Sequence, residues 1–395
     1  MFARPATPSI VTAMACLLLA GRLATAADRP RLPSASPASV GMSPERLEEV
    51  DEVVAKALVA GQMPGCVVLV ARQGKTVLLR AYGHRSLEPE KTPMTVDTLF
   101  DLASLTKPVA AATSVMLLAE DGKLCLDDPV AKHLPEFAAN GKQAITIRQL
   151  LTHQGGLIAD NDISDYAVSR EEAITRLLAT RPRSSPGESF VYSDVGFLIL
   201  GLLVERVAGE SLDRFVASRV FQPLGLEEMG YLPSVELSRR AAPTEKRNGH
   251  WMQGEVHDPR AFALGGIAGH AGLFSTAEDL AVYAQMVCNR GNYDGKQILK
   301  PETVAEMTRP QQTAGGIRAL GWDMRTGYSS NRGQGFSDRA LGHGGFTGTS
   351  LWIDPELELI VIFLSNRVHP DGKGSVNQLA GRIGTIAAKA ISAGD

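Results

Sequence analysis

A serine and a lysine three residues apart, Ser104 and Lys107, are the pair in this sequence best placed to do chemistry. On a helix, residues i and i+3 lie on one face, so the Lys107 Nζ can reach the Ser104 Oγ. A serine hydroxyl becomes a strong nucleophile when a neighbouring base takes its proton. We therefore expect Ser104 to be a nucleophile and Lys107, held neutral by burial, to be its base. The alternatives are a serine that caps a helix and a lysine in solvent.

The segment Tyr192-Ser193-Asp194 offers two more candidates downstream. A phenol acts as a base near neutral pH only when a cation stabilises its anion, and Lys107 is the expected cation. Tyr192 and Lys107 would then share one proton, so Tyr192 is predicted to be catalytic. The alternative is a buried tyrosine at the edge of the core. Asp194 is predicted to bind substrate, to hold Lys107 or to cap the following helix.

A third candidate segment is His343-Gly344-Gly345-Phe346. His343 is expected to orient a substrate carboxylate or to assist proton transfer during deacylation, unless it is only a structural histidine. Gly344 and Gly345 would let the substrate backbone approach a strand edge. The backbone N–H groups of Phe346 and Ser104 would form an oxyanion hole.

The order of these motifs resembles that of the penicillin-recognising serine hydrolases, which carry Ser-x-x-Lys, then Tyr-x-Asn, then Lys/His-x-Gly. This family comprises class C β-lactamases, related D-Ala-D-Ala carboxypeptidases or penicillin-binding proteins, and their esterase relatives. The resemblance also covers residues 150–157 (LLTHQGGL) and 272–280 (GLFSTAEDL), and extends from about Ser43 to the C-terminal helix. It implies an α+β fold of the β-lactamase/transpeptidase type and hydrolysis through an acyl-enzyme, with no cofactor.

The sequence departs from the family pattern in two motifs. Asp194 replaces the asparagine whose amide would hold the side-chain amide of a β-lactam, and an ionised aspartate offers only acceptors. His343 and Gly344 replace a Lys-Thr pair. The first reading is a β-lactamase-like or D-Ala-D-Ala carboxypeptidase-like hydrolase. The alternatives are a carboxylesterase, which both departures favour, and a penicillin- or muropeptide-binding sensor without turnover.

Sequence patterns predict one antiparallel sheet with flanking helices, built from the N- and C-terminal segments, and a mostly helical insertion at about 100–300. A cleft between two such lobes is a usual place for an active site. The helices and strands expected outside the insertion are a helix at 43–61, strands at 66–71 and 76–79, strands at 349–353 and 359–365, and a helix at 375–391.

The N-terminus has the pattern of a cleavable signal peptide, residues 1–26, with Arg4, an apolar stretch at 10–20 and Ala24-Thr25-Ala26 as a cleavage site. The apolar stretch is too short for a stable membrane span. We therefore expect a periplasmic or secreted protein. Residues 27–42, rich in proline, serine and alanine, are expected to be a flexible lead-in to a hydrolase domain at 43–395.

Composition and charge limit the classes of molecule that this protein is expected to bind. The 395 residues are 44% hydrophobic and carry a net charge of −3, which gives no electrostatic case for nucleic acid. We expect a small-molecule or peptidoglycan-derived substrate: a β-lactam, a D-Ala-D-Ala peptide or an ester. No metal is expected, because the eight histidines show no close metal-ligand spacing. The cysteines after the signal peptide are expected to be buried small residues, with one disulfide left open: Cys66, Cys125 and Cys288.

Overall fold

The computed structural model describes residues 1, 3 and 31–391. The expected signal segment therefore lies outside the described residues, apart from Met1 and Ala3, and stays a prediction. The boundaries of the expected hydrolase domain, residues 43–395, also stay a prediction. Among the residues that the structure describes, no helix has the length and apolar character needed to cross a bilayer.

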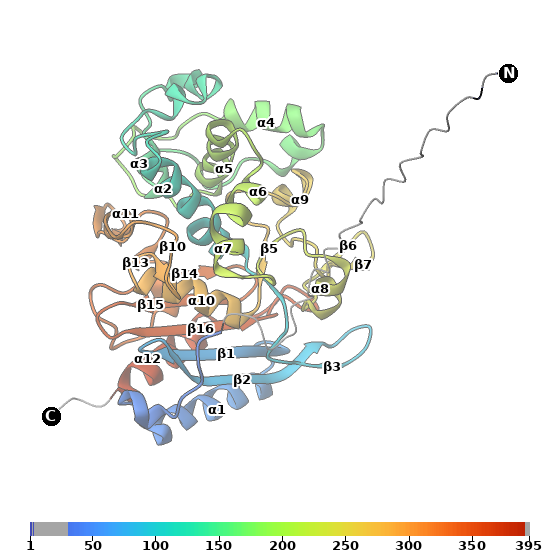
Figure 1. Ribbon diagram of the computed structural model, residues 1–395, viewed down its shortest axis with the longest axis vertical. Coiled ribbons are helices and arrows are strands. Elements are labelled where there is room, and N and C mark those ends of the chain that lie inside the picture. The colour runs from blue at the N-terminus through green and yellow to red at the C-terminus, as the bar shows by residue number, and fades with distance from the viewer. Residues whose placement is uncertain (2, 4–30, 392–395) are drawn as a thin grey trace.

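A nine-stranded antiparallel sheet forms the centre of the molecule (Figure 1). Its C-terminal strands lie beside its N-terminal strands, because β16 pairs with β1 along its whole length. In sheet order the strands are β11 (Gln311–Thr313), β12 (Gly316–Arg318), β13 (Asp323–Thr326), β14 (Leu341–Gly345), β15 (Thr349–Asp354), β16 (Leu359–Ser365), β1 (Gly65–Arg72), β2 (Lys75–Ser86) and β3 (Thr92–Pro93).

Strand β1 shows why the sheet needs a layer on each face. Successive side chains on a strand point to opposite faces, and nearly every residue of β1 is buried. Val68 belongs to the apolar core beneath helices α1 (Pro44–Val59) and α12 (Asn377–Ala390). Val67 belongs to the second core, which contains α10 (Ala277–Cys288) and the helical lobe. Burial of both faces explains the uninterrupted apolar sequence of this strand.

The helical lobe covers the other side of α10 (Figure 1). Its helices are α2 (Thr113–Glu120), α3 (Ile147–Leu151), α4 (Arg170–Leu178), α5 (Asp194–Ala208), α6 (Leu212–Val216), α7 (Gln222–Leu224) and α9 (Pro259–Ala263), while α8 (Val235–Arg240) and α11 (Pro301–Met307) flank it. Three small sheets complete the fold: β4 (Phe100–Asp101) with β8 (Leu273–Ser275) and β5 (Gly230–Tyr231); β6 (Lys246–Arg247) with β7 (His250–Trp251); and β9 (Asn292–Tyr293) with β10 (Lys296–Gln297).

Several expectations are confirmed and two are wrong. The expected hairpins are β1–β2 and β15–β16, and both terminal helices are present. Residues 31–42 do not form a flexible lead-in: Leu32 and Met42 are buried, and Ser34 pairs with Thr76 of β2. All three described cysteines are free, but of the three only Cys66 is buried, while Cys288 is half-buried and Cys125 is exposed.

Candidate active site

Ser104 lies on a strained turn between β4 and the helical lobe. A short 3₁₀ turn, Ala103–Leu105, is followed by a π-helical turn, Lys107–Ala112, and then by α2. Ala103 has a φ of 46°, a conformation that non-glycine residues rarely adopt without support. The buried Asp101 carboxylate provides that support, because its Oδ1 accepts the Ala103 N–H at 2.8 Å and its Oδ2 accepts the His257 N–H at 2.7 Å.

The turn between β14 and β15 holds the segment that contains Ser104 through hydrogen bonds from the side of the sheet. The Thr347 Oγ1 donates to the Asp101 carbonyl at 2.7 Å, and the Thr349 Oγ1 donates to the Leu102 carbonyl at 3.0 Å. A Cβ on Gly345 would lie 2.5 Å from that Leu102 carbonyl, so this close approach requires glycine. The third motif therefore holds Ser104 in place as well as lining the site.

The predicted nucleophile and lysine are in hydrogen-bond contact. The Lys107 Nζ donates to the Ser104 Oγ at 2.9 Å, and it also donates to the His270 carbonyl at 3.2 Å. An ion pair of 2.7 Å joins the same Nζ to the Asp194 Oδ1. The Lys107 side chain is completely buried, so these groups are its immediate polar surroundings.

The charge of Lys107 differs from the expected one. Burial lowers the pKa of the ammonium, but the negative charge of Asp194, together with hydrogen bonds to Asp194 and Tyr192, outweighs burial and raises it above its ordinary value. The expectation that burial keeps Lys107 neutral is therefore wrong in this structure, because the aspartate at position 194 supplies a negative partner.

Asp194 opens α5, but it does not cap it. The Ser193 Oγ accepts the Gly196 N–H at 3.1 Å and is the cap of that helix. Of the three roles open to Asp194, the structure shows the one in which its carboxylate holds Lys107.

Tyr192 lies over Lys107, with 5.0 Å between the Nζ and the centre of the ring. Burial raises the pKa of the phenol, although the charge of Lys107 and hydrogen bonding with Lys107 and Ser104 oppose this. The ring is stacked on Tyr328 at 4.9 Å and contacts His153 at 4.5 Å between centres. Tyr192 is thus a rigidly packed neutral phenol beside the nucleophile and the lysine.

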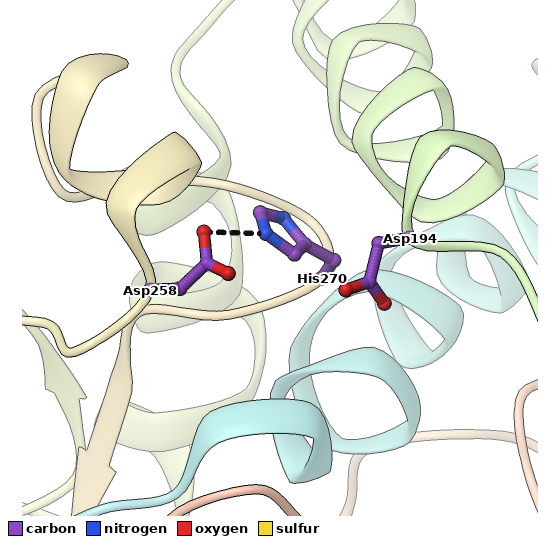
Figure 2. Close-up of side chains that lie close together, drawn as sticks. All are labelled: Asp194, Asp258 and His270. Carbon is purple, nitrogen blue, oxygen red and sulfur yellow. Dashed lines mark hydrogen bonds and ion pairs between the residues drawn. The ribbon is translucent and has the colours of Figure 1, made fainter. Parts of the chain in front are cut away.

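Asp194, Asp258 and His270 lie close together in the structure, although Asp194 is far from the other two in the sequence (Figure 2). One potential ligand atom from each lies within 4.8 Å of the other two. The His270 Nε2 and the Asp258 Oδ1 are 2.9 Å apart. Burial raises the pKa of Asp258, but the charge of His270 and its hydrogen bond more than offset this and lower it. These donors suit a divalent cation by type, but Asp194 is already paired with Lys107, and we interpret the cluster as a charge network beside Ser104.

His343 lies on β14 with its ring buried. The Nδ1 is 2.7 Å from the Gly344 carbonyl, so Nδ1 carries the proton and Nε2 is an acceptor. Burial, Arg318 and Lys107 lower the pKa of His343 well below its ordinary value. A neutral imidazole does not attract a carboxylate, which argues against that expected role. Assistance in proton transfer and a purely structural role both stay predictions.

A cavity of about 610 Å³ brings the predicted residues together. All of them line it except Lys107, which is buried beneath Ser104. Phe346 lies at the rim with 60% of its surface exposed, 5.4 Å from the His257 ring and 4.6 Å from the Arg367 guanidinium. Whether its N–H belongs to an oxyanion hole stays a prediction.

Several residues at this cavity were missed from the sequence. His270 lies in the glycine-rich segment 265–272, and this loop borders the cavity. A Cβ on Gly269 would lie 2.1 Å from the Phe197 carbonyl, so the loop packs directly on α5. Asp258 and Arg318 carried no motif signal, and both line the cavity only in the folded chain.

Comparisons with known proteins agree with this geometry. The family model described as Beta-lactamase matches residues 50–384. A protein of Escherichia coli O157:H7, provisionally named a D-alanyl-D-alanine carboxypeptidase, is 32% identical over 384 residues, which cover 87% of this chain and 88% of that protein.

Two solved structures are also similar. A penicillin-binding protein homologue from Caulobacter crescentus superposes with a TM-score of 0.72 at 23% identity, covering 89% of this chain and 99% of that one. EstCE1, described as a hydrolase with promiscuous acyltransferase activity, has a TM-score of 0.69 at 26% identity, covering 88% and 98%. The resemblance inferred from the motifs is confirmed: this chain belongs to the Beta-lactamase family.

Proposed function

We propose that this protein is an exported serine hydrolase that works through an acyl-enzyme on Ser104. The observation that carries the proposal is the hydrogen bond of 2.9 Å between the Lys107 Nζ and the Ser104 Oγ, at the edge of a cavity large enough for a small peptide or ester. A serine activated by a buried neighbour is the arrangement that nucleophilic acyl transfer needs.

The proton of Ser104 passes to a cluster of three groups. Because Asp194 keeps Lys107 protonated at rest, the reactive form is the one in which Lys107, Tyr192 and Asp194 together have lost one proton. The Ser104 Oγ then attacks the substrate carbonyl carbon while its proton moves to the Lys107 Nζ. Tyr192 lies next to both groups and relays a proton to the leaving amine or alcohol, whose bond to the carbonyl breaks.

The negatively charged oxygen that forms when Ser104 attacks the carbonyl needs hydrogen-bond donors. The backbone N–H groups of Ser104 and Phe346 are the proposed ones. Both residues line the cavity, and the Thr347 and Thr349 hydrogen bonds fix the two segments relative to each other. Water then attacks the acyl-enzyme, the acid product leaves and the Ser104 hydroxyl is restored. His343, with a free acceptor nitrogen, is proposed to assist proton transfer in this step.

The first substrate class proposed is a peptide ending in D-alanyl-D-alanine, or a related β-lactam, by analogy with the Escherichia coli relative. The second is a carboxylic ester, supported by the EstCE1 likeness and by Asp194, which cannot donate to a β-lactam amide. Export to the periplasm or medium is proposed from the signal pattern of residues 1–26. The N-terminal sequence of the protein recovered from the periplasm would test it.

Labelling with a fluorescent penicillin and a fluorescent fluorophosphonate tests the function. Wild-type protein should be labelled by at least one probe, and Ser104→Ala should not be labelled by either. Ser375→Ala is the matched control, because Ser375 lines the same cavity. Labelling that persists in Ser104→Ala would overturn the assignment. A stable penicillin adduct without turnover would indicate the sensor, and rapid ester hydrolysis without an adduct would indicate the esterase.

A further inference from the structure

His270 and Asp258 form a side-chain pair at the cavity that the acyl transfer described above does not use. The His270 ring is buried, and its Nε2 lies 2.9 Å from the Asp258 Oδ1. Although burial raises the pKa of Asp258, the charge of His270 and hydrogen bonding lower it, so the carboxylate is ionised and accepts the Nε2–H. The side chain of His270 accordingly points toward Asp258 (Figure 2).

The backbone of the loop that carries His270 is bonded to the segment of the nucleophile at three points. The Lys107 Nζ donates to the His270 carbonyl at 3.2 Å. The Leu273 N–H donates to the Thr106 Oγ1 at 3.1 Å, and the Leu273 carbonyl accepts the Leu102 N–H at 2.9 Å. Residue 270 thus carries both the ring that a carboxylate holds and the carbonyl that accepts from the lysine.

The His270 carbonyl completes the polar surroundings of the Lys107 Nζ. An ammonium has three N–H groups, and this one has three oxygen neighbours: the Ser104 Oγ at 2.9 Å, the Asp194 Oδ1 at 2.7 Å and the His270 carbonyl at 3.2 Å. After the loss of one proton, the two remaining N–H groups can be directed at Asp194 and the carbonyl. The lone pair then faces the Ser104 Oγ, from which it takes a proton. The position of the carbonyl therefore helps to decide where the lone pair points.

The backbone on either side of His270 is rich in glycine and needs an anchor. Gly269 precedes it directly, and Gly272, two residues after it, has a φ of 113°. Because glycine restricts the backbone less than other residues do, local geometry fixes the peptide plane at residue 270 only weakly. The side chain supplies an anchor through Asp258, whose Oδ1 also accepts the Ala261 N–H at 2.7 Å and caps α9. The start of a helix thus holds the loop in its orientation.

We propose that His270 and Asp258 are a positioning pair for acylation. Asp258 holds the His270 ring, and the ring fixes the backbone carbonyl that aims the Lys107 Nζ at the nucleophile. In this role neither side chain transfers a proton or touches the substrate. The inference rests on the proposed function, and it requires that loss of the pair slows the attack of Ser104 without weakening the binding of the molecule that is attacked.

Saturation kinetics with the fluorescent fluorophosphonate test the pair, and the fluorescent penicillin replaces this probe if it alone labels the wild type. The experiment gives the maximal labelling rate, kinact, the half-saturating probe concentration, KI, and the final labelled fraction. His270→Leu should lower kinact by about tenfold or more, because a small misplacement of a catalytic group is that costly. KI and the labelled fraction should not change. His270→Gln, whose side-chain amide can donate to Asp258, should regain most of the wild-type rate.

Asp258→Ser removes the other half of the pair. Serine still caps a helix, so α9 is kept, but its side chain is too short to reach the ring. This variant should lower kinact as His270→Leu does, and it tests the proposal if His270→Leu fails to fold. His133→Leu is the matched control, because His133 and Asp128 form the same kind of contact at 2.9 Å and are not part of the cavity lining. Its kinact should equal that of the wild type.

The possible results separate the pair from the proposed function. Wild-type kinact in His270→Leu or Asp258→Ser would overturn the proposal, and a smaller labelled fraction at wild-type kinact would show that the pair only stabilises the fold. A loss in His270→Gln as large as that in His270→Leu would also overturn it. A wild type that neither probe labels at Ser104 would contradict the proposed function and this inference with it, whereas unchanged variants of a labelled wild type would contradict the pair alone.

Discussion

The Asp194 carboxylate lies 2.7 Å from the Lys107 ammonium, which in turn lies 2.9 Å from the Ser104 hydroxyl. The lysine next to the nucleophile is therefore part of a buried ion pair. This contact raises the pKa of Lys107, whereas burial alone would lower it. We therefore expect Asp194 to set the pH at which Ser104 is activated.

Asp194→Asn should shift the pH profile of acylation to lower pH. Removing the negative charge destabilises the ammonium, so the pKa of Lys107 falls and its neutral fraction at a given pH rises. On the acid side of the profile, kcat/KM should rise by about tenfold for each unit by which that pKa falls. The measurement is kcat/KM against pH for one ester substrate.

Asp160→Asn is the control for that comparison, because Asp160 lines the same cavity and forms an ion pair with Arg260, 3.5 Å away. This control should shift the profile much less. An acid limb that stays in place in Asp194→Asn, or that moves to higher pH, would contradict the role assigned to the ion pair.

Tyr192→Phe should lower kcat/KM by about 100-fold or more, a loss typical of a missing proton relay. The ring that stacks on Tyr328 and His153 is kept, so the melting temperature should stay close to that of the wild type. Steady-state kinetics with a thermal melt make the comparison, and Tyr328→Phe serves as control. Unchanged kinetics in Tyr192→Phe would remove the phenol from the mechanism.

The KM for a carboxylate substrate should stay flat between about pH 6 and pH 8. The pKa of His343 is lowered by burial, Arg318 and Lys107, so the imidazole is neutral across this range and its charge does not change. Arg318 keeps its charge throughout. A KM that rises as pH passes through the ordinary histidine range would instead show that a protonated His343 binds the carboxylate.

Gly345→Ala should disable the enzyme without unfolding it. The new Cβ would lie 2.5 Å from the Leu102 carbonyl and push β14 away from the turn that holds Ser104. Overpacking of this kind costs about 1–3 kcal/mol of stability. Gly230→Ala, where a Cβ meets no atom within 4 Å, is the control. Wild-type kcat/KM in Gly345→Ala would show that the close approach is not needed.

Sequence reasoning found the parts of the site that depend on local geometry. Ser104 and Lys107 meet because they are three residues apart on one turn, and the β15–β16 hairpin follows from a short connection between apolar strands. Motif order added Tyr192 and His343, whose positions the fold brings to one cavity.

The remaining features depend on packing between distant segments. The ion pair of Lys107 with Asp194 joins two helical segments, the pairing of Asp258 with His270 spans α9 and the loop that follows it, and Arg318 lines the cavity from β12. The composition of residues 31–42 wrongly predicted a flexible segment. Although this segment is rich in proline and serine, its few apolar side chains are buried and hold it against the fold.

Peptide mapping by mass spectrometry, after acid quenching during turnover of a p-nitrophenyl ester, tests the central claim most directly. We predict an acyl mass increment confined to the peptide that contains Ser104, present in the wild type and absent in Ser104→Ala. Continued turnover without any adduct on that peptide, or an adduct on another residue, would contradict an acyl-enzyme at Ser104.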